Sequence, residues 1–143
     1  GVFSIGYLPA TSAALSGLAS WGAQSAPQVR RGVSFLVEHQ RTEGGWGESP
    51  DSVERGDYHD LGRCSPTQTA MALTGLIASR SLAAGPAIER GIWNLLWTQA
   101  PDGSWVDEDP TAASLTDVLF VNNPAEPLTW PLLALTSFLE SRY

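Results

Sequence analysis

The sequence predicts an all-α protein built from stacked helical hairpins, and two observations support this prediction. Apolar residues recur at steps of three and four along most of the 143 residues, which is the spacing of helices with one buried face. A motif of six residues also occurs twice, 59 residues apart, and such a period usually means that one supersecondary unit has been copied and stacked. No segment shows the convincing apolar–polar alternation of a half-buried strand.

Five helices are expected, each with an apolar stripe along one face. Ser65 before Pro66 supplies a hydroxyl N-cap and a proline at the first helical position, and Gly85 before Pro86 marks a second start in much the same way. The expected ranges, in chain order, are 11–22, 27–40, 66–80, 86–99 and 128–142.

The helices group into a repeating unit within a single segment that spans residues 1–143. The expected repeats are 11–64 and 66–127, and residues 128–143 form the first half of a third copy. Long connections, 41–64 and 100–127, follow the two copies of the motif. Connections of this length are uncommon unless they are packed down or functional.

The repeated motif reads R-G-x-x-x-L-x-x-x-Q-x-x-x-G-x-W. Its Gln is expected in the last turn of a helix, where a side-chain amide can donate to carbonyls that lack helical partners. Its Trp follows six residues later and is expected to stack on that amide while the indole N–H donates to a nearby carbonyl. The motif therefore predicts two structural clamps, Gln40 with Trp46 and Gln99 with Trp105.

This motif resembles the Gln-Trp repeat of the squalene–hopene and oxidosqualene cyclases, which are class II terpene cyclases. The segments GGWGES at 44–49 and SPTQTA at 65–70 resemble further family segments in the right order, and WPLLAL at 130–135 followed by Arg142-Tyr143 resembles the C-terminus of the family. The resemblance covers nearly the whole chain and maps it to the last fraction of a longer enzyme. It implies a fold that is part of an α/α toroid barrel.

The resemblance implies a cyclase that protonates a linear polyprenyl substrate and stabilises the resulting carbocations with aromatic rings. The family's Asp-x-Asp-Asp acid does not occur in these residues, so no catalytic residue is expected here, and Asp107-Glu108-Asp109 is interpreted as a solvated acidic loop. The expected substrate-binding residues are Tyr7, Met71 and Phe120. Met71 replaces a family tryptophan, and the family's aromatic stretch between 117 and 130 is largely lost, which favours a shorter or diphosphate-bearing prenyl substrate.

Two other interpretations remain open at this stage. The missing acid and the lost aromatics favour a helical-hairpin binding or scaffold module of the same superfamily that has lost catalysis. A zinc barrel of the protein prenyltransferase type would use ligands such as His39, His59 and Cys64, but these lack a family-like spacing, so neither a metal nor a cofactor is expected. An Asp-x-Asp-Asp motif upstream of Gly1 would favour the enzyme.

Composition excludes some partners and suggests others. The net charge is −7 and the basic residues are scattered, so the chain lacks the basic face that nucleic-acid binding needs. The single cysteine rules out an internal disulfide, and no apolar run is long enough for a membrane-spanning helix. The start of the chain lacks Met, which suggests a piece of something longer. The expected partner is the remainder of a cyclase barrel, with a cytoplasmic location and peripheral membrane contact through other parts.

Overall fold

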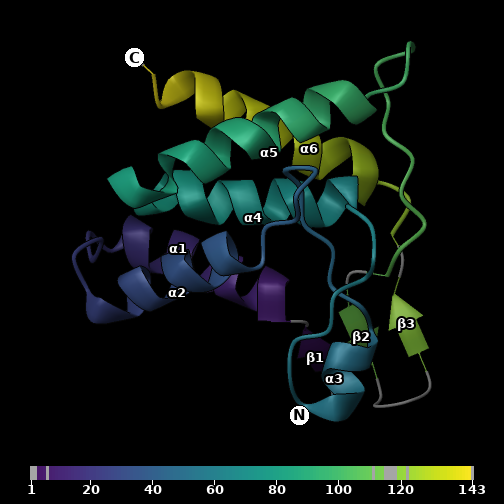
Figure 1. The fold of residues 1–143 in the computed structure, drawn as a ribbon, viewed down its shortest axis with the longest axis horizontal. Helices are drawn as coiled ribbons and strands as arrows, with labels where there is room; N and C mark the ends of the chain where they lie inside the picture. The colour runs from purple at the N-terminus through teal and green to yellow at the C-terminus, as the bar shows by residue number, and fades with distance from the viewer. Residues whose placement is uncertain (1–2, 6, 111, 115–118, 122, 143) are drawn as a thin grey trace.

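The structure is a computed structural model that describes residues 3–5, 7–110, 112–114, 119–121 and 123–142. The elements, in chain order, are β1 (Phe3–Ile5), α1 (Tyr7–Ser20), α2 (Pro27–Glu38), α3 (Asp51–Arg55), α4 (Pro66–Ser79), the 3₁₀ turn η1 (Leu82–Ala84), α5 (Gly85–Thr98), β2 (Ala112–Ser114), β3 (Leu119–Val121) and α6 (Glu126–Glu140). Figure 1 shows the long helices stacked one above another in roughly parallel rows, with the strands gathered at the lower right.

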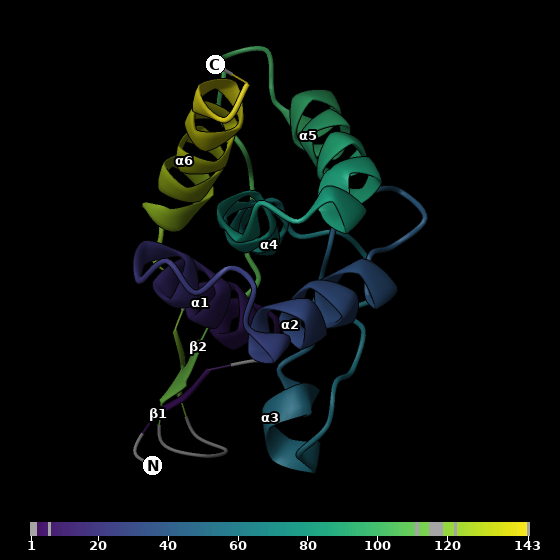
Figure 2. The same ribbon diagram turned by 90° about the vertical axis from the view of Figure 1, so that its left-hand side faces the viewer.

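The five long helices of the described residues form two layers, and α4 contacts helices of both. Helix α4 contacts α1, α2, α5 and α6. Figure 2 shows α4 end-on, with α1 and α6 on one side of it and α2 and α5 on the other. Helices α1, α4 and α6 therefore form one layer, which we call the inner layer, and α2 and α5 cover its outer side. The predicted all-α class is confirmed, and each inner helix except α6 is followed by its outer partner.

All five predicted helices are present, with three informative differences at their ends. Helix α1 begins at Tyr7, four residues before its predicted start. Helices α2 and α5 end at Glu38 and Thr98, so Gln40 and Gln99 lie just beyond the helices and not in their last turns. The start of α4 at Pro66 is as predicted, and the Ser65 hydroxyl accepts a hydrogen bond from the Gln68 N–H at 3.1 Å.

A small antiparallel sheet was not predicted. Its strand order is β1-β2-β3, with Phe3 opposite Ser114 and Ala113 opposite Phe120. Each strand has only three residues, which is too short for an alternating pattern to stand out in the sequence. The sheet joins the first described residues to the connection between α5 and α6, segments that are more than 100 residues apart.

The long connection after α2 is packed down. It contains α3, and its two arms are joined by hydrogen bonds from Ser49 N–H to His59 O at 2.8 Å and from Leu61 N–H to Gly47 O at 2.9 Å. An ideal Cβ at Gly47 would lie 2.1 Å from the carbonyl oxygen of Arg63, so only glycine fits between these arms. The connection is therefore an ordered, irregular segment, and its residue Glu48 binds the start of α1.

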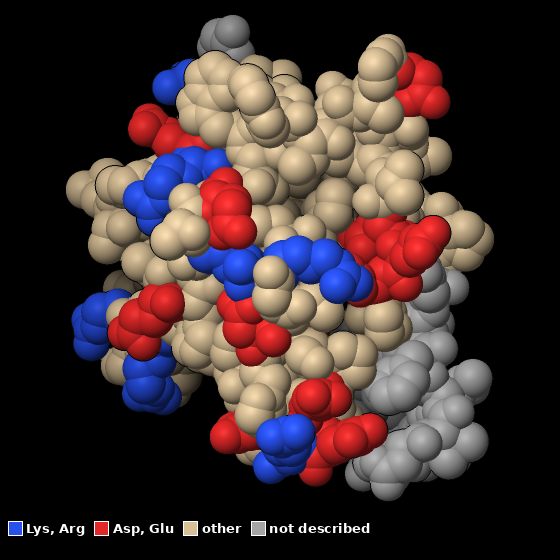
Figure 3. Space-filling model, turned by 45° about the vertical axis from the view of Figure 1, so that its right-hand side comes forward, with Lys and Arg blue, Asp and Glu red and all other residues tan. Residues whose placement is uncertain are grey.

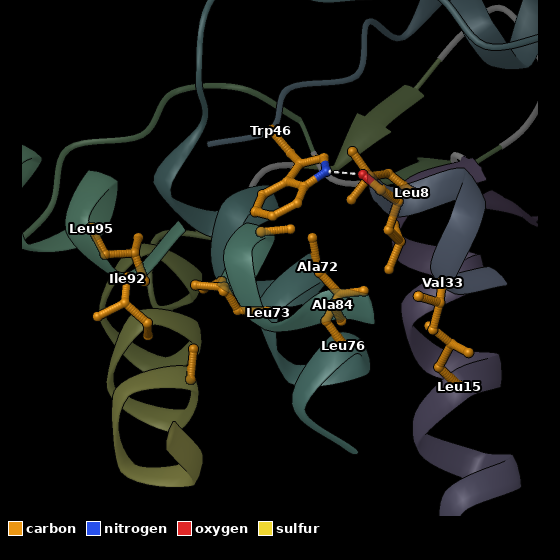
Figure 4. Packing of buried hydrophobic residues seen from close by; sticks show 14 of the residues in the cluster. Leu8, Leu15, Val33, Trp46, Ala72, Leu73, Leu76, Ala84, Ile92 and Leu95 are labelled. Carbon is orange, nitrogen blue, oxygen red and sulfur yellow. Dashed lines mark hydrogen bonds between the residues drawn. The ribbon is translucent and has the colours of Figure 1, made fainter. Parts of the chain in front are cut away.

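The core lies where the inner and outer layers meet. Its largest member is Trp46, which is completely buried, and Leu73 of α4 lies beneath its ring in Figure 4. Helices α1 and α4 lie close together at Gly75, where an ideal Cβ would lie 2.8 Å from the Cα of Ser12. The Ser12 hydroxyl donates a hydrogen bond to the Met71 carbonyl at this crossing. A small residue at position 75 is what allows the two inner helices to pack so closely.

Candidate functional site

Each motif tryptophan fastens the end of an outer helix. The indole N–H of Trp46 donates to the Leu36 carbonyl in α2 at 2.7 Å, and that of Trp105 donates to the Leu95 carbonyl in α5 at 2.9 Å. Both rings are buried, and the dashed line in Figure 4 marks the bond of Trp46. The sequence predicted that each indole would donate to a carbonyl, and the structure places these acceptors in the last turns of the preceding helices.

The motif glutamines do not bind the carbonyls that the sequence predicted. The Gln40 amide donates to Gly44 O at 2.6 Å and to Ala87 O, in α5, at 2.8 Å. The Gln99 amide donates to Gly103 O at 2.9 Å. Because both glutamines lie beyond the helix ends, each amide closes its own loop, and the indole takes the helix carbonyl. We call residues 40–46 the first Gln-Trp loop and residues 99–105 the second.

The first Gln-Trp loop docks on the outer helix of the next repeat. Arg90 of α5 donates to the side-chain oxygen of Gln40, and the Asn94 amide donates to Glu43 O at 3.0 Å. Gly44 has a φ of +89°, and a Cβ there would lie 2.6 Å from the Arg90 carbonyl oxygen, so the loop lies directly against the α5 backbone. The loop therefore joins two repeats as well as closing one.

This difference between the two loops predicts unequal effects of the same substitution. Gln40→Ala removes bonds to its own loop and to α5, so we expect a loss of about 1–2 kcal/mol in the free energy of unfolding. Gln99→Ala removes one exposed bond, so we expect a loss of about 0.5 kcal/mol. Urea denaturation of both variants measures the difference, and equal losses would show that the contact with α5 contributes nothing.

The structure also shows helix-capping roles for two carboxylates, Glu48 and Asp107, that the sequence analysis did not predict. Glu48 accepts hydrogen bonds from the N–H groups of Tyr7 and Leu8 at 2.8 and 2.7 Å. Asp107 accepts from the Thr67 N–H at 2.9 Å and from the Ser65 hydroxyl at 2.5 Å. Each carboxylate lies two residues after a motif Trp, so the repeated motif extends to W-x-[E/D]. Comparing the two copies beyond the tryptophan would have revealed this signal.

The predicted acidic loop is therefore only partly solvated. Asp107 caps the start of α4, and Asp109 forms an ion pair with Arg63 in which the aspartate side chain is only 13% exposed. Glu108 is exposed. A second ion pair joins Arg41 to Asp60 across the base of the long connection. Figure 3 shows basic and acidic side chains interspersed over this face of the molecule, in keeping with such local pairs.

The three expected substrate-binding residues lie in different elements. Tyr7 is the first residue of α1, and its side chain is 39% exposed. Met71 lies in the middle of α4 and is 7% exposed. Phe120 pairs through its backbone with Ala113 in the sheet, and its side chain lies outside the described part of the structure. Contact of these residues with a substrate stays a prediction.

The candidate metal ligands are used within the protein. His39 lies against the Phe35 and Tyr58 rings at centroid distances of 4.3 and 4.1 Å, and His59 Nε2 lies 2.7 Å from Asp57 Oδ1. Desolvation by burial raises the pKa of the Cys64 thiol, which disfavours the thiolate that binds metals. Within the described ranges, no three His, Cys, Asp or Glu side chains gather closely enough to hold a metal ion.

These features define a class of protein: an array of helical hairpins in which a Gln-Trp loop closes the end of each outer helix, and in which the first of these loops also binds the next outer helix. The model of the family described as "Squalene-hopene cyclase C-terminal domain" matches residues 1–140. The chain belongs to the squalene–hopene and oxidosqualene cyclase family. Among the described residues, no helix combines the length and the hydropathy that crossing a bilayer requires.

Individual relatives agree with the family match. The chain is 31% identical over 145 residues to a Sinorhizobium fredii protein named "Probable squalene--hopene cyclase", and this match covers 99% of the chain and 22% of that protein. It is 36% identical over 111 residues to the lanosterol synthase of Candida albicans, covering 76% of the chain and 15% of that enzyme. The chain thus spans about a fifth or less of the length of these relatives.

Proposed function

We propose that the chain is the C-terminal part of a class II terpene cyclase, which cyclises a linear polyprenyl substrate by a protonation-initiated carbocation cascade. The observation that carries the proposal is the family match over residues 1–140, together with the hairpin array that it accompanies. The substrate is squalene-like or a prenyl diphosphate. The general acid comes from an Asp-x-Asp-Asp motif outside these residues. Tyr7, Met71 and Phe120 contribute to the substrate-binding wall.

Unfilled contact positions support the proposal that a longer barrel surrounds this chain. Gly75 of α4 packs on Ser12 of α1, but its counterpart in the preceding copy, Gly17, has none of the described atoms within 4 Å of an ideal Cβ. Gly17 is exposed in the last turn of α1. A preceding inner helix, supplied by the remainder of the cyclase, would contact α1 there as α1 contacts α4.

Exposed positions on the outer helix α5 and its Gln-Trp loop support the same proposal of a longer barrel. The first Gln-Trp loop binds α5, whereas within the part of the chain that the structure describes Gln99 bonds only to its own loop at Gly103. Trp93 and Trp97 of the outer helix α5 are 69% and 89% exposed. A further outer helix beside α5, supplied by another part of the barrel, would give the second Gln-Trp loop the kind of partner that α5 gives the first.

The test is made on the full-length polypeptide that contains this chain. We expect its reading frame to encode an Asp-x-Asp-Asp motif upstream of Gly1. The purified enzyme should convert squalene or a linear prenyl diphosphate to cyclic products, and changing the motif's aspartates to asparagine should abolish the conversion. A full-length protein that lacks the motif and leaves these substrates unchanged would support the alternative, a helical-hairpin scaffold, and would exclude the cyclase.

A further inference from the structure

Glu48 is a buried carboxylate whose two oxygens are both committed to the start of α1. Its side chain accepts from the Tyr7 N–H at 2.8 Å through Oε1 and from the Leu8 N–H at 2.7 Å through Oε2, and the residue is 3% exposed. The first N–H groups of a helix lack helical partners and carry partial positive charge, so a carboxylate is well suited to bind them. The position of Tyr7 therefore depends on a side chain 41 residues away.

The backbone of Glu48 is itself held from α4. The Glu48 N–H donates to Gln68 Oε1 at 2.6 Å, and Gln68 Nε2 donates to the Glu48 carbonyl at 3.1 Å. Gln68 is 2% exposed and lies in the first turn of α4. Glu48 is thus fixed on one inner helix and binds the start of another, so it cannot shift without breaking this paired contact.

The second copy of the motif shows what is special about Glu48. Asp107 caps α4 from the equivalent position, but α4 also has its own serine cap at Ser65 and a proline at Pro66. The residue before Tyr7 in the sequence is a glycine, which offers no side-chain cap. Helix α1 therefore relies on Glu48 where α4 has a local cap as well.

We propose that Glu48 is the positioning residue for Tyr7 in the cyclisation reaction, an inference that rests on the proposed function. By holding the backbone of the first residue of α1, Glu48 sets where the Tyr7 ring stands relative to the substrate. An aromatic ring stabilises a carbocation only when the cation lies within about 6 Å of the ring centroid. A misplacement of about 1 Å in such a site can cost a factor of about 100 in rate. Glu48 acts through Tyr7 and does not itself touch the substrate.

The experiment uses the full-length enzyme with squalene as the probe substrate, or the prenyl diphosphate that it converts. Glu48→Gln keeps the size of the side chain but turns an amide donor toward one of the two N–H groups. We expect kcat to fall about 10- to 100-fold with KM within about twofold, and the share of incompletely cyclised products to rise. Glu48→Asp, which keeps the charge but not the reach, should show a smaller change of the same kind. Hydrogen exchange should quicken at Tyr7 and Leu8 while the rest of the inner layer stays protected.

Asp107→Asn is the matched control, because it weakens the equivalent cap of α4 without touching Tyr7. It should lower Tm to a similar extent and leave the product distribution unchanged. In a Tyr7→Ala background, Glu48→Gln should add little further change in products, since both act through the same ring. An active enzyme in which Glu48→Gln lowers only Tm, or changes products equally with and without Tyr7, would overturn the positioning role alone. A wild-type enzyme without cyclised products would overturn the proposed function and this role with it.

Discussion

Trp46→Ala is expected to lower the free energy of unfolding of the 143-residue chain by about 3–5 kcal/mol, the usual range for removing a buried Trp. The ring is fully buried and carries the hydrogen bond to Leu36 O. It also reaches the next repeat, because an ideal Cβ at Gly91 would lie 2.9 Å from its Cζ3 atom. Removing the ring therefore leaves a cavity between α2, α4 and α5 and an unpaired carbonyl at the end of α2. Urea denaturation measures the loss.

Trp105→Ala provides the internal comparison. Its ring is 4% exposed and makes the same kind of hydrogen bond to Leu95 O, but the second Gln-Trp loop does not bind a following outer helix among the described residues. We expect a smaller loss, about 2–3 kcal/mol. Trp46→Phe, which keeps most of the ring but not the N–H donor, should cost about 1–2 kcal/mol. If Trp46→Ala left the free energy of unfolding unchanged, the ring would contribute nothing to stability. The proposal that the motif joins one repeat to the next would then be wrong.

The helices could be predicted from the sequence because their signals are local and repeated. The steps of three and four give each helix its buried face, and the repeated motif aligns one hairpin with the next. The helix ends were less predictable where the cap is distant. Helix α1 begins at Tyr7 because Glu48 binds its first N–H groups, and nothing near Tyr7 in the sequence indicates such a cap.

In the candidate site, too, contacts within one repeat could be predicted in part, and contacts between repeats could not. A hydrogen bond from each indole to a nearby carbonyl could be predicted, but its acceptor in the last turn of the preceding helix could not, because the sequence had assigned those carbonyls to the Gln amide. The contact of Gln40 with Ala87 could not be predicted either, since it depends on how one repeat stacks on the next. The three strands were missed because three-residue segments carry too little pattern, and their pairing is set by contacts between distant parts of the chain.

The two copies of the repeat share sequence, but they differ in environment. The first copy has a neighbour on its C-terminal side, so its Gln-Trp loop rests on α5. Among the described residues, the second copy is followed only by α6, an inner helix without an outer partner. Two residues at equivalent positions can therefore differ in packing, with one buried against a neighbour and the other exposed to solvent. Comparing the same substitution at equivalent positions of the two copies therefore measures how much the stacking of one repeat on the next contributes to stability.

Gly75→Ala and Gly17→Ala make this comparison at the crossing of the inner helices. At Gly75 the added methyl group would lie 2.8 Å from the Cα and 3.0 Å from the carbonyl oxygen of Ser12, and backbone atoms cannot move aside as a flexible side chain can. Helices α1 and α4 must separate, and we expect a loss of about 1–3 kcal/mol. At Gly17 none of the described atoms lies within 4 Å, so alanine should stabilise α1 by about 0.5–1 kcal/mol through its higher helix propensity.

The same pair of variants should affect stability differently in the isolated chain and in the complete barrel. In the 143-residue chain the two substitutions should have opposite signs in urea denaturation. In the full-length protein, a preceding inner helix that crosses α1 at Gly17 would make Gly17→Ala destabilising as well, because its methyl group would then meet a backbone as that of Gly75→Ala does. If Gly17→Ala stabilised the full-length protein too, α1 would have no inner neighbour at this position, and the repeat would not continue toward the N-terminus in the way that the barrel requires.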